Sequence, residues 1–230
     1  MSKKNIKYGH LLIPILFVLV SGVLNSQSVS ENLGQNQNTE WTISRFLNKE
    51  FKNVKISGNP KIVNSPYGKA VYFDGVDDAF FLDKMPLIGL KEFTVEMIFN
   101  PSVDGVFEQR VVHMGKVSDD RILLEIRAVD GNWYFDGFAA SGENKLALID
   151  EKLTHPLGKW YHVAFVVTQN SLTTYVNGKL ELQQPYTFKP IEIGQTSFGV
   201  RLNKRSWFKG IIYKIKISPN QLKPNSFMSF

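Results

Sequence analysis

From Trp41 onward, short runs of β-branched and aromatic residues alternate with clusters of glycine, proline, asparagine and aspartate. Such runs are typical of β-strands, and the residues between them are those that tight turns require. One weak helical segment, at 44–51, is the exception. The pattern therefore predicts an all-β chain in which many short strands pack as a sandwich or barrel. The clearest runs span residues 70–73, 93–99, 110–114, 122–127, 133–139, 160–168, 172–176 and 210–217.

Two neighbouring runs predict how strands pair. Asn177-Gly178 separates the runs 172–176 and 179–182. This dipeptide is the strongest short-range signal of a β-hairpin, because both central residues need positive φ. The preceding run, 160–168, carries apolar side chains on both of its faces. We therefore expect it to be a central strand that is covered on both sides.

The N-terminus has the features of a secretory signal peptide, predicted to span residues 1–28. Lysines precede an apolar run at 11–24, and small residues, Ser26 and Ser28, follow it. This run is shorter than the ~20 residues that cross a bilayer, so we expect no membrane span after cleavage. The alternative is an uncleaved membrane anchor.

Domain organisation follows from the composition of the remaining segments. Residues 29–40 are polar and rich in asparagine and glutamine, which predicts a disordered spacer. We expect one domain at 41–222 and a C-terminal tail at 223–230. The chain has no cysteine, which excludes disulfides, thiolate metal sites and thiol nucleophiles. Export without disulfides favours a bacterium, with the protein secreted, periplasmic or on the cell surface.

The charge balance bears on the class of partner. The formal net charge of +6 falls by three, to +3, once Lys3, Lys4 and Lys7 are removed with the signal peptide. The remaining charge is spread along the chain, without a lysine/arginine block that would follow a phosphate backbone. We therefore expect no nucleic-acid partner.

Four stretches, in this order, resemble the laminin-G-like, concanavalin A-like jelly-roll domains. They are KAVYFDGVDD at 69–78, FTVEMIF at 93–99, GKWYHVA followed by LTTYVNG at 158–178, and FKGIIYKIKI at 208–217. The resemblance implies two antiparallel sheets in a curved jelly-roll sandwich. It also implies binding of glycans or other surface ligands, which is what most members do. Some relatives are polysaccharide lyases or glycoside hydrolases, and many hold a structural calcium ion near the Phe-Asp-Gly turn.

The calcium site that the resemblance implies would lie at Asp74, Asp77 and Asp78. Calcium takes six to eight oxygen ligands, so three nearby carboxylates could begin a site. Family members often add an acidic residue after the closing glycine, where this chain has Ile211 and Ile212. The alternative is that the aspartates only build the turn, with no cofactor.

A row of alternating charge marks the candidate ligand-binding surface. In a strand at 121–127, Arg121, Glu125 and Arg127 share one face with Leu123. The other face, with Ile122, Leu124 and Ile126, is expected to be the core face. Arginine offers a fork for carboxylate or sulfate, and aromatic rings stack on sugars. A second basic and aromatic cluster lies near the closing strand, with Lys204 and Arg205 among its members. The predicted ligand-binding residues are Arg121, Glu125, Arg127, Trp133, Tyr134, Asp136, Arg201 and Trp207.

We therefore predict an exported carbohydrate-binding module whose partner is a polysaccharide, with binding favoured over catalysis. One alternative is a small lyase acting on a uronate-containing glycan, in which His113, Arg127 and Tyr134 would do the chemistry. Glycoside hydrolysis would need two facing acids, such as Glu125 with Asp136 or with Glu96. Further alternatives are a protein-interaction module of the cell envelope, and cross-strand ion pairs on a solvated face.

Overall fold

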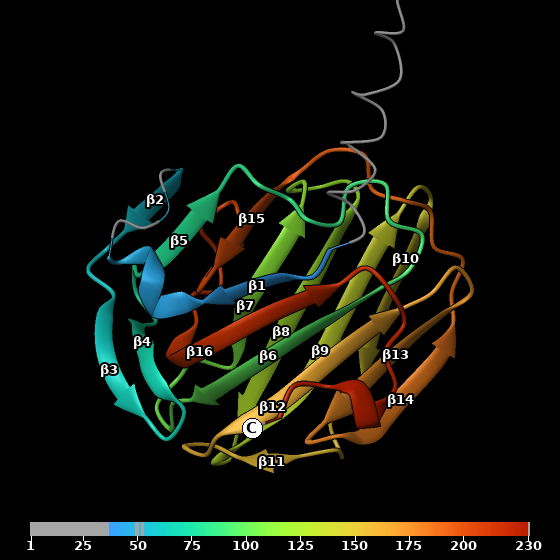
Figure 1. The fold of residues 1–230 in the computed structure, drawn as a ribbon. Helices are drawn as coiled ribbons and strands as arrows, with labels where there is room; N and C mark the ends of the chain where they lie inside the picture. Colours follow the sequence, from blue (N-terminus) through green and yellow to red (C-terminus); the bar gives the residue numbers. More distant parts are fainter. Residues whose placement is uncertain (1–36, 49–50, 52, 230) are drawn as a thin grey trace, which may run out of the picture.

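The strand-forming runs assemble into two stacked antiparallel sheets of eight strands each (Figure 1). The computed structural model describes residues 37–48, 51 and 53–229. The predicted signal peptide and the predicted spacer up to residue 36 lie outside these residues. The predicted all-β sandwich of two antiparallel sheets is confirmed.

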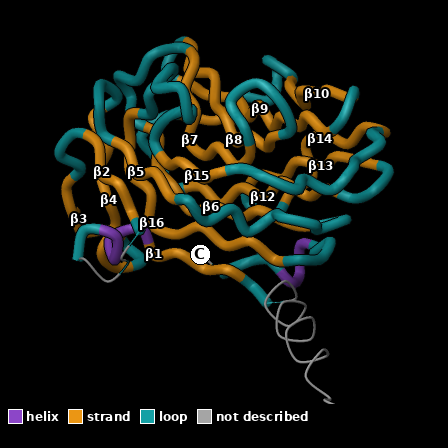
Figure 2. The backbone as a smooth tube through the Cα atoms, turned by 90° about the horizontal axis from the view of Figure 1, so that it is seen from above, coloured by secondary structure: helices purple, strands orange, loops and turns teal. Residues whose placement is uncertain are grey.

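Sheet A contains strands from all four stretches that carry the resemblance. Figure 2 shows its strands β1, β6 and β16 on the opposite side of the molecule from β7, β8 and β9 of sheet B. The order of sheet A is β14 (Lys179–Pro185), β13 (Ser171–Val176), β12 (Tyr161–Val167), β6 (Phe93–Pro101), β16 (Lys209–Ser218), β4 (Gly68–Asp74) and β3 (Lys61–Ser65), with β1 (Thr39–Thr42) also paired to β16.

Sheet B carries the charged strand and its neighbours. Its order is β10 (Asn144–Ile149), β9 (Asn132–Ser141), β8 (Arg121–Val129), β7 (Glu108–Gly115), β15 (Gln195–Phe198), β5 (Ala79–Leu82) and β2 (Val54–Ser57), with β11 (His155–Pro156) also paired to β9. Along most strands, side chains that point into the core alternate with side chains that point outward, because successive residues of a strand face opposite sides of the sheet. Between the sheets lies one apolar core that includes Phe73, Phe99, Ile126 and Phe165.

The hairpin and the central strand are as predicted. Asn177 and Gly178 have φ of 50° and 74°, and they connect β13 to β14. Strand β12 lies between β6 and β13, and all seven of its residues are buried. Burial on both faces explains why its sequence is apolar at nearly every position.

The structure adds detail to three predicted segments. The predicted helix at 44–51 is not found among its described residues: they form the end of the four-residue 3-10 turn η1 (Ile43–Phe46) and a turn after it, and the Phe46 ring is buried against Phe80 and Phe198. Thr39 and Glu40, assigned to the spacer, begin β1, because their backbone pairs with β16. The C-terminal tail is packed on sheet A, since Phe227 contacts the His162 ring at 5.5 Å between centroids.

The tail covers a buried histidine–glutamate pair on the outer face of sheet A. His162 Nε2 lies 3.0 Å from Glu96 Oε1, and both side chains are almost fully buried. The Met228 N–H donates to the same Glu96 oxygen. In the tail, the turn η2 (Pro224–Ser226) has three residues. Both 3-10 turns are far shorter than a membrane span. The described part of the chain contains no helix that is long and apolar enough to cross a membrane.

Candidate functional site

The charged row predicted on β8 lies on the outer face of sheet B. Ile122, Leu124 and Ile126 enter the core, so the alternate residues face outward. The strand register then places Glu125 directly opposite Asp136 of β9 and Arg110 of β7. The structure therefore brings Glu125, Arg127 and Asp136 together, as the sequence suggested.

These side chains form a buried ion network, defined as Glu108, Arg110, Glu125, Arg127 and Asp136. Arg127 Nη2 lies 2.6 Å from Asp136 Oδ2 and 3.4 Å from Glu125 Oε2. Arg110 Nε lies 2.9 Å from Glu125 Oε1, and Glu108 pairs with both arginines. The side chains of Glu125 and Asp136 are each only 3% exposed. The two arginines are thus already occupied by carboxylates of the same chain.

Crowding of three carboxylates around two arginines changes the proton affinity of the network. Burial, together with the neighbouring Asp136 carboxylate, raises the pKa of Glu125 to about 7. A carboxylic acid that keeps its proton near neutral pH reduces the excess of negative charge in this buried region. The network is therefore close to electrically balanced when Glu125 is protonated.

The ion network anchors a loop, residues 199–207, across the outer face of sheet B. The Arg110 N–H donates to the Ser206 carbonyl at 2.8 Å, and Arg110 Nη1 donates to Ser206 Oγ at 3.0 Å. Earlier in the loop, the Leu202 N–H donates to His113 Nδ1 at 3.3 Å. Side chains of β7 thus fix both the middle and the end of this loop.

Loop 199–207 forms one wall of a depression that we call the sheet B hollow. Its volume is about 490 Å³. The Phe81 ring of β5 contributes an aromatic surface, with Lys204 Nζ 5.9 Å from its centroid. Gln195 Nε2 donates to Asp83 Oδ1 at 2.7 Å. The hollow is lined by Asn53, Val54, Lys55, Phe81, Asp83, Gln195, Leu202 and Lys204.

Three other predicted ligand-binding residues, Arg121, Arg201 and Trp207, lie outside the ion network. Arg121 stacks over the Phe138 ring at 4.7 Å and donates to the Asp119 carbonyl. Arg201 donates to the Val117 carbonyl at 2.6 Å, so it helps to hold the turn between β7 and β8. Trp207 is half-buried.

Trp133 requires a correction. Its side chain is 0% exposed, and its ring packs 5.2 Å from Phe99 and 5.1 Å from Tyr161 in the core. Along β9 the odd-numbered residues point inward, so Trp133 and Asp136 lie on opposite faces. Tyr134 lies on the outer face but is only 6% exposed. Trp133 therefore belongs to the core and does not lie on the outer face of sheet B, where the sequence analysis had grouped it with Asp136.

His113, a candidate catalytic residue of the lyase alternative, is 0% exposed beneath loop 199–207. Nε2 lies 3.0 Å from the Lys116 carbonyl, and Nδ1 accepts the Leu202 N–H. A neutral imidazole protonated on Nε2 satisfies both contacts. A general base must reach the proton that it removes, and this ring does not reach the surface. The geometry thus assigns His113 to loop anchoring and does not favour the lyase alternative.

The buried His113 predicts a measurable pH dependence. Burial lowers the pKa of His113 from 6.5 to about 4. The unfolded chain therefore binds this proton more tightly, and the stabilisation is complete above pH 6.5 and is lost as the pH falls toward 4. We expect the His113 contribution to the free energy of unfolding to fall by about 3 kcal/mol over this window.

Urea unfolding of the wild type and of His113→Gln, measured from pH 4 to 8, isolates this contribution. The raised pKa of Glu125 acts in the opposite direction, because its folded form holds the proton more tightly up to pH 7. Since Glu125 is present in both proteins, the difference between their profiles belongs to His113. Parallel profiles would contradict the assignment.

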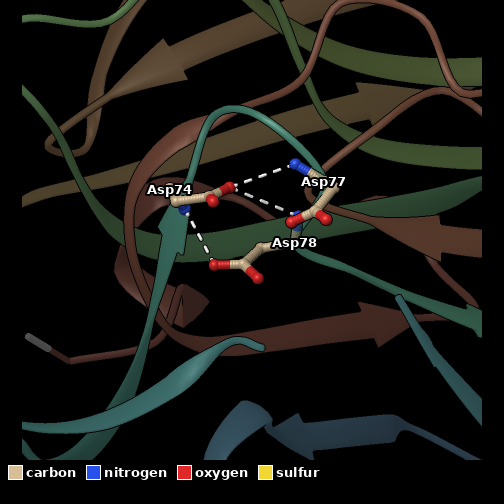
Figure 3. Close-up of side chains that lie close together, drawn as sticks. All are labelled: Asp74, Asp77 and Asp78. Atoms are coloured by element: carbon tan, nitrogen blue, oxygen red, sulfur yellow. Dashed lines mark hydrogen bonds between the residues drawn. The ribbon is translucent and has the colours of Figure 1, made fainter. Parts of the chain in front are cut away.

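The three aspartates converge at the turn after β4 (Figure 3). One carboxylate oxygen from each lies within 4.8 Å of the others, close enough to share one cation. Asp74 Oδ1 accepts the N–H groups of Val76, Asp77 and Asp78. Burial acts to raise the pKa of Asp74, but these N–H groups outweigh it and lower the pKa. Asp74 thus builds the turn, as the alternative interpretation proposed.

Asp78 also has structural contacts. Its Oδ1 accepts the Asn59 N–H at 2.6 Å and its Oδ2 accepts the Asp74 N–H at 3.0 Å. Burial raises the pKa of Asp78. Asp77 is exposed, and it leaves its carboxylate available for a cation. The residues present fit a calcium ion completed by water, and the calcium site stays a prediction.

Thermal melting tests the calcium prediction. With calcium in tenfold excess over its Kd, we expect the melting temperature to rise by about 4 °C, because calcium relieves the repulsion among the three carboxylates. Asp77→Asn should remove this rise without changing the melting temperature in chelator. An identical melting temperature with calcium and with chelator would show that the aspartates serve only the turn.

The hollow is composed of residues that sequence reasoning largely missed. Lys55, Phe81 and Gln195 lie on three short strands, Asp83 directly follows one of them, and none belongs to a charged row. Lys204 was the exception, because it belongs to the basic cluster near the closing strand. The alternation at 79–82, with Phe80 and Leu82 in the core, could have identified Phe81 as an outward-facing ring.

Comparisons with known proteins agree with this architecture. The family model described as Laminin_G_3, concanavalin A-like lectin/glucanases superfamily, matches residues 74–226, more than half of the chain. No curated protein sequence matches this chain.

Among solved structures, domain 4 of AbnA, a GH43 extracellular arabinanase from Geobacillus stearothermophilus in complex with arabinotriose, superposes with a TM-score of 0.57. It is 18% identical, and the match covers 75% of this chain and 84% of that one. The binding domain of botulinum neurotoxin DC in complex with SialylT has a TM-score of 0.54 and 11% identity, covering 75% of this chain and 44% of the toxin domain. Tailspike protein 2 of the Escherichia coli O157:H7 bacteriophage CAB120 has a TM-score of 0.54 and 13% identity, covering 72% of this chain and 25% of that protein. At these identities the likeness concerns the fold.

Proposed function

This chain belongs to the concanavalin A-like lectin/glucanase superfamily, and we propose that it acts as a carbohydrate-binding module. The observation that carries the proposal is the sheet B hollow. Its volume of about 490 Å³ falls in the range of small-ligand sites, and it combines one aromatic ring with several convergent polar side chains.

The chemistry of the lining suits a sugar. The half-buried Phe81 ring offers a face against which the C–H groups of a pyranose or furanose can pack. Lys55 and Lys204 donate hydrogen bonds, Asp83 accepts them and Gln195 does both. Sugar hydroxyls are both donors and acceptors, so a mixed lining of this kind satisfies them.

The fold neighbours support the same class of ligand. The arabinanase domain is bound to arabinotriose, and the toxin domain is bound to SialylT. We extend only the class, a glycan, to this chain. The signal-peptide pattern at 1–28 supports export to a compartment where such glycans occur.

We propose that the charged residues predicted as ligand contacts act mainly by positioning. The ion network pairs internally and holds Ser206, so that Lys204 and Leu202 stand at the hollow. Arg201 supports the same loop from the turn between β7 and β8. Binding without catalysis is proposed, because His113 does not reach the surface.

Phe81→Ala tests the site directly. We expect the affinity for the best-binding oligosaccharide of a panel to fall about tenfold, because the aromatic surface of the hollow is lost. Isothermal titration calorimetry, with arabino-, xylo-, cello- and galacturono-oligosaccharides, measures this loss. The absorbance of the same mixtures tests for lyase activity, because the unsaturated uronate that a lyase releases absorbs near 235 nm.

Phe107→Ala is the matched control. The Phe107 ring is 54% exposed and lies 5.8 Å from the Arg127 guanidinium, outside the hollow. We expect its removal to leave affinity unchanged. The reverse result, with Phe107→Ala weakening binding and Phe81→Ala neutral, would move the ligand to the ion network.

A further inference from the structure

A second group of aromatic rings lies on the outer face of sheet A, away from the sheet B hollow. The Tyr67 ring, in the turn between β3 and β4, lies 5.7 Å from the Tyr213 ring of β16. Trp160, directly before β12, packs edge-on against Tyr67 at 5.5 Å. All three side chains are half-buried, so each keeps an exposed surface.

An irregularity in β16 creates this arrangement. The register with β6 shifts between Ile212 and Lys214. A bulge of this kind inserts one residue and re-aims the side chains around it. Ile212 and Ile215 both enter the core, so Tyr213 and Lys214 face outward side by side. A regular strand would have sent one of the two inward.

A hollow of about 310 Å³ lies beside these rings, and we call it the tyrosine hollow. Its lining includes Glu40, Tyr67, Tyr213, Lys214, Lys216 and Met228. Lys214 Nζ lies 2.6 Å from Glu40 Oε1, and Lys216 Nζ lies 3.5 Å from Glu96 Oε2. Each lysine is thus matched by a carboxylate, so the lining is close to neutral overall.

We infer that the tyrosine hollow is a second carbohydrate site, which takes a neutral sugar ring. The tyrosine rings supply an apolar surface for the sugar face. The Glu40–Lys214 pair supplies an acceptor and a donor for adjacent hydroxyl groups. An anionic sugar would have to displace a carboxylate from a lysine, so the balanced charge favours a neutral one. This inference shares with the proposed function only the class of ligand, and neither site depends on the other.

Binding stoichiometry tests the inference. Calorimetric titration with neutral arabino-, xylo- and cello-oligosaccharides should give two sites per chain in the wild type. Tyr213→Ala should remove one of them, with at least a tenfold loss of affinity at that site. Tyr213→Phe keeps the ring and should bind within about twofold of the wild type. Phe81→Ala should remove the other site and leave one site per chain.

Each outcome is decisive. One site that is lost in Phe81→Ala and unchanged in Tyr213→Ala overturns the inference and leaves the proposed function intact. One site that is lost in Tyr213→Ala and unchanged in Phe81→Ala supports the inference and overturns the sheet B assignment. If no neutral oligosaccharide binds, the inference is wrong, and the galacturono-oligosaccharides then decide the proposed function alone. Circular dichroism melting of each variant confirms that it is folded.

Discussion

Replacing Arg127 with alanine should lower the free energy of unfolding by about 3–5 kcal/mol. Arg127 contacts three carboxylates, two of which, Glu125 and Asp136, are 3% exposed and directly opposite each other in the register. Without the guanidinium, these buried acids lose most of their compensating charge. Urea unfolding at pH 8, above the pKa of about 7 to which burial raises Glu125, measures the loss.

A second substitution separates charge from packing. In the Arg127→Ala background, Glu125→Gln removes one of the two uncompensated carboxylates and should recover part of the lost stability. Lys145→Ala, at an exposed position of β10 in the same sheet, is the control and should change stability by less than about 0.5 kcal/mol. A loss in Arg127→Ala no larger than in this control would show that the network does not stabilise the sheet.

Gly199→Ala should destabilise the protein by about 4 kcal/mol and weaken glycan binding with it. Gly199 has φ of +84°, a conformation that costs a residue with a side chain about 1–2 kcal/mol. An added Cβ would also stand 2.5 Å from the Phe73 ring and 2.8 Å from the Asp78 carbonyl, and such overpacking adds about 1–3 kcal/mol. Because Gly199 begins the loop that walls the sheet B hollow, the displaced loop should also lose its contacts with a bound sugar.

Gly131→Ala is the matched control for this variant. Gly131 has φ of +74°, but nothing lies within 4 Å of an added Cβ. It should therefore show the backbone strain alone, about 1–2 kcal/mol, and normal glycan binding. Equal destabilisation in the two variants, measured by urea unfolding, would mean that the close approach of loop 199–207 to the core is unimportant.

The parts of the fold that could be predicted are those that local sequence signals specify. Asn177-Gly178 predicted a hairpin, because few dipeptides tolerate two consecutive positive φ angles. The apolar character of 160–168 predicted a strand covered on both faces, although what covers it, including the tail at Phe227, depends on contacts distant in sequence. The prediction of a helix at 44–51 was wrong for the described residues because local propensity does not determine this segment. Its conformation depends on tertiary contacts, which place the Phe46 ring of η1 in the core against Phe198.

The candidate site was predictable only in part. Alternation along β8 and β9 correctly grouped Glu125, Arg127 and Asp136, and the same alternation, applied strictly, would have placed Trp133 in the core. It could not show that loop 199–207 folds over His113, because that loop is distant in the chain. The sheet B hollow joins Lys55, Phe81 and Lys204 from segments far apart in sequence, and no local pattern marks such an assembly.

Mapping a bound oligosaccharide by nuclear magnetic resonance tests the central claim most directly. The isotope-labelled protein would be titrated with the oligosaccharide that binds most tightly in the calorimetric panel. Carbohydrate binding in the sheet B hollow predicts the largest amide shifts at Lys55, Phe81, Gln195 and Lys204. Saturable shifts that leave these four residues unchanged, or no shifts with any oligosaccharide of the panel, would contradict it.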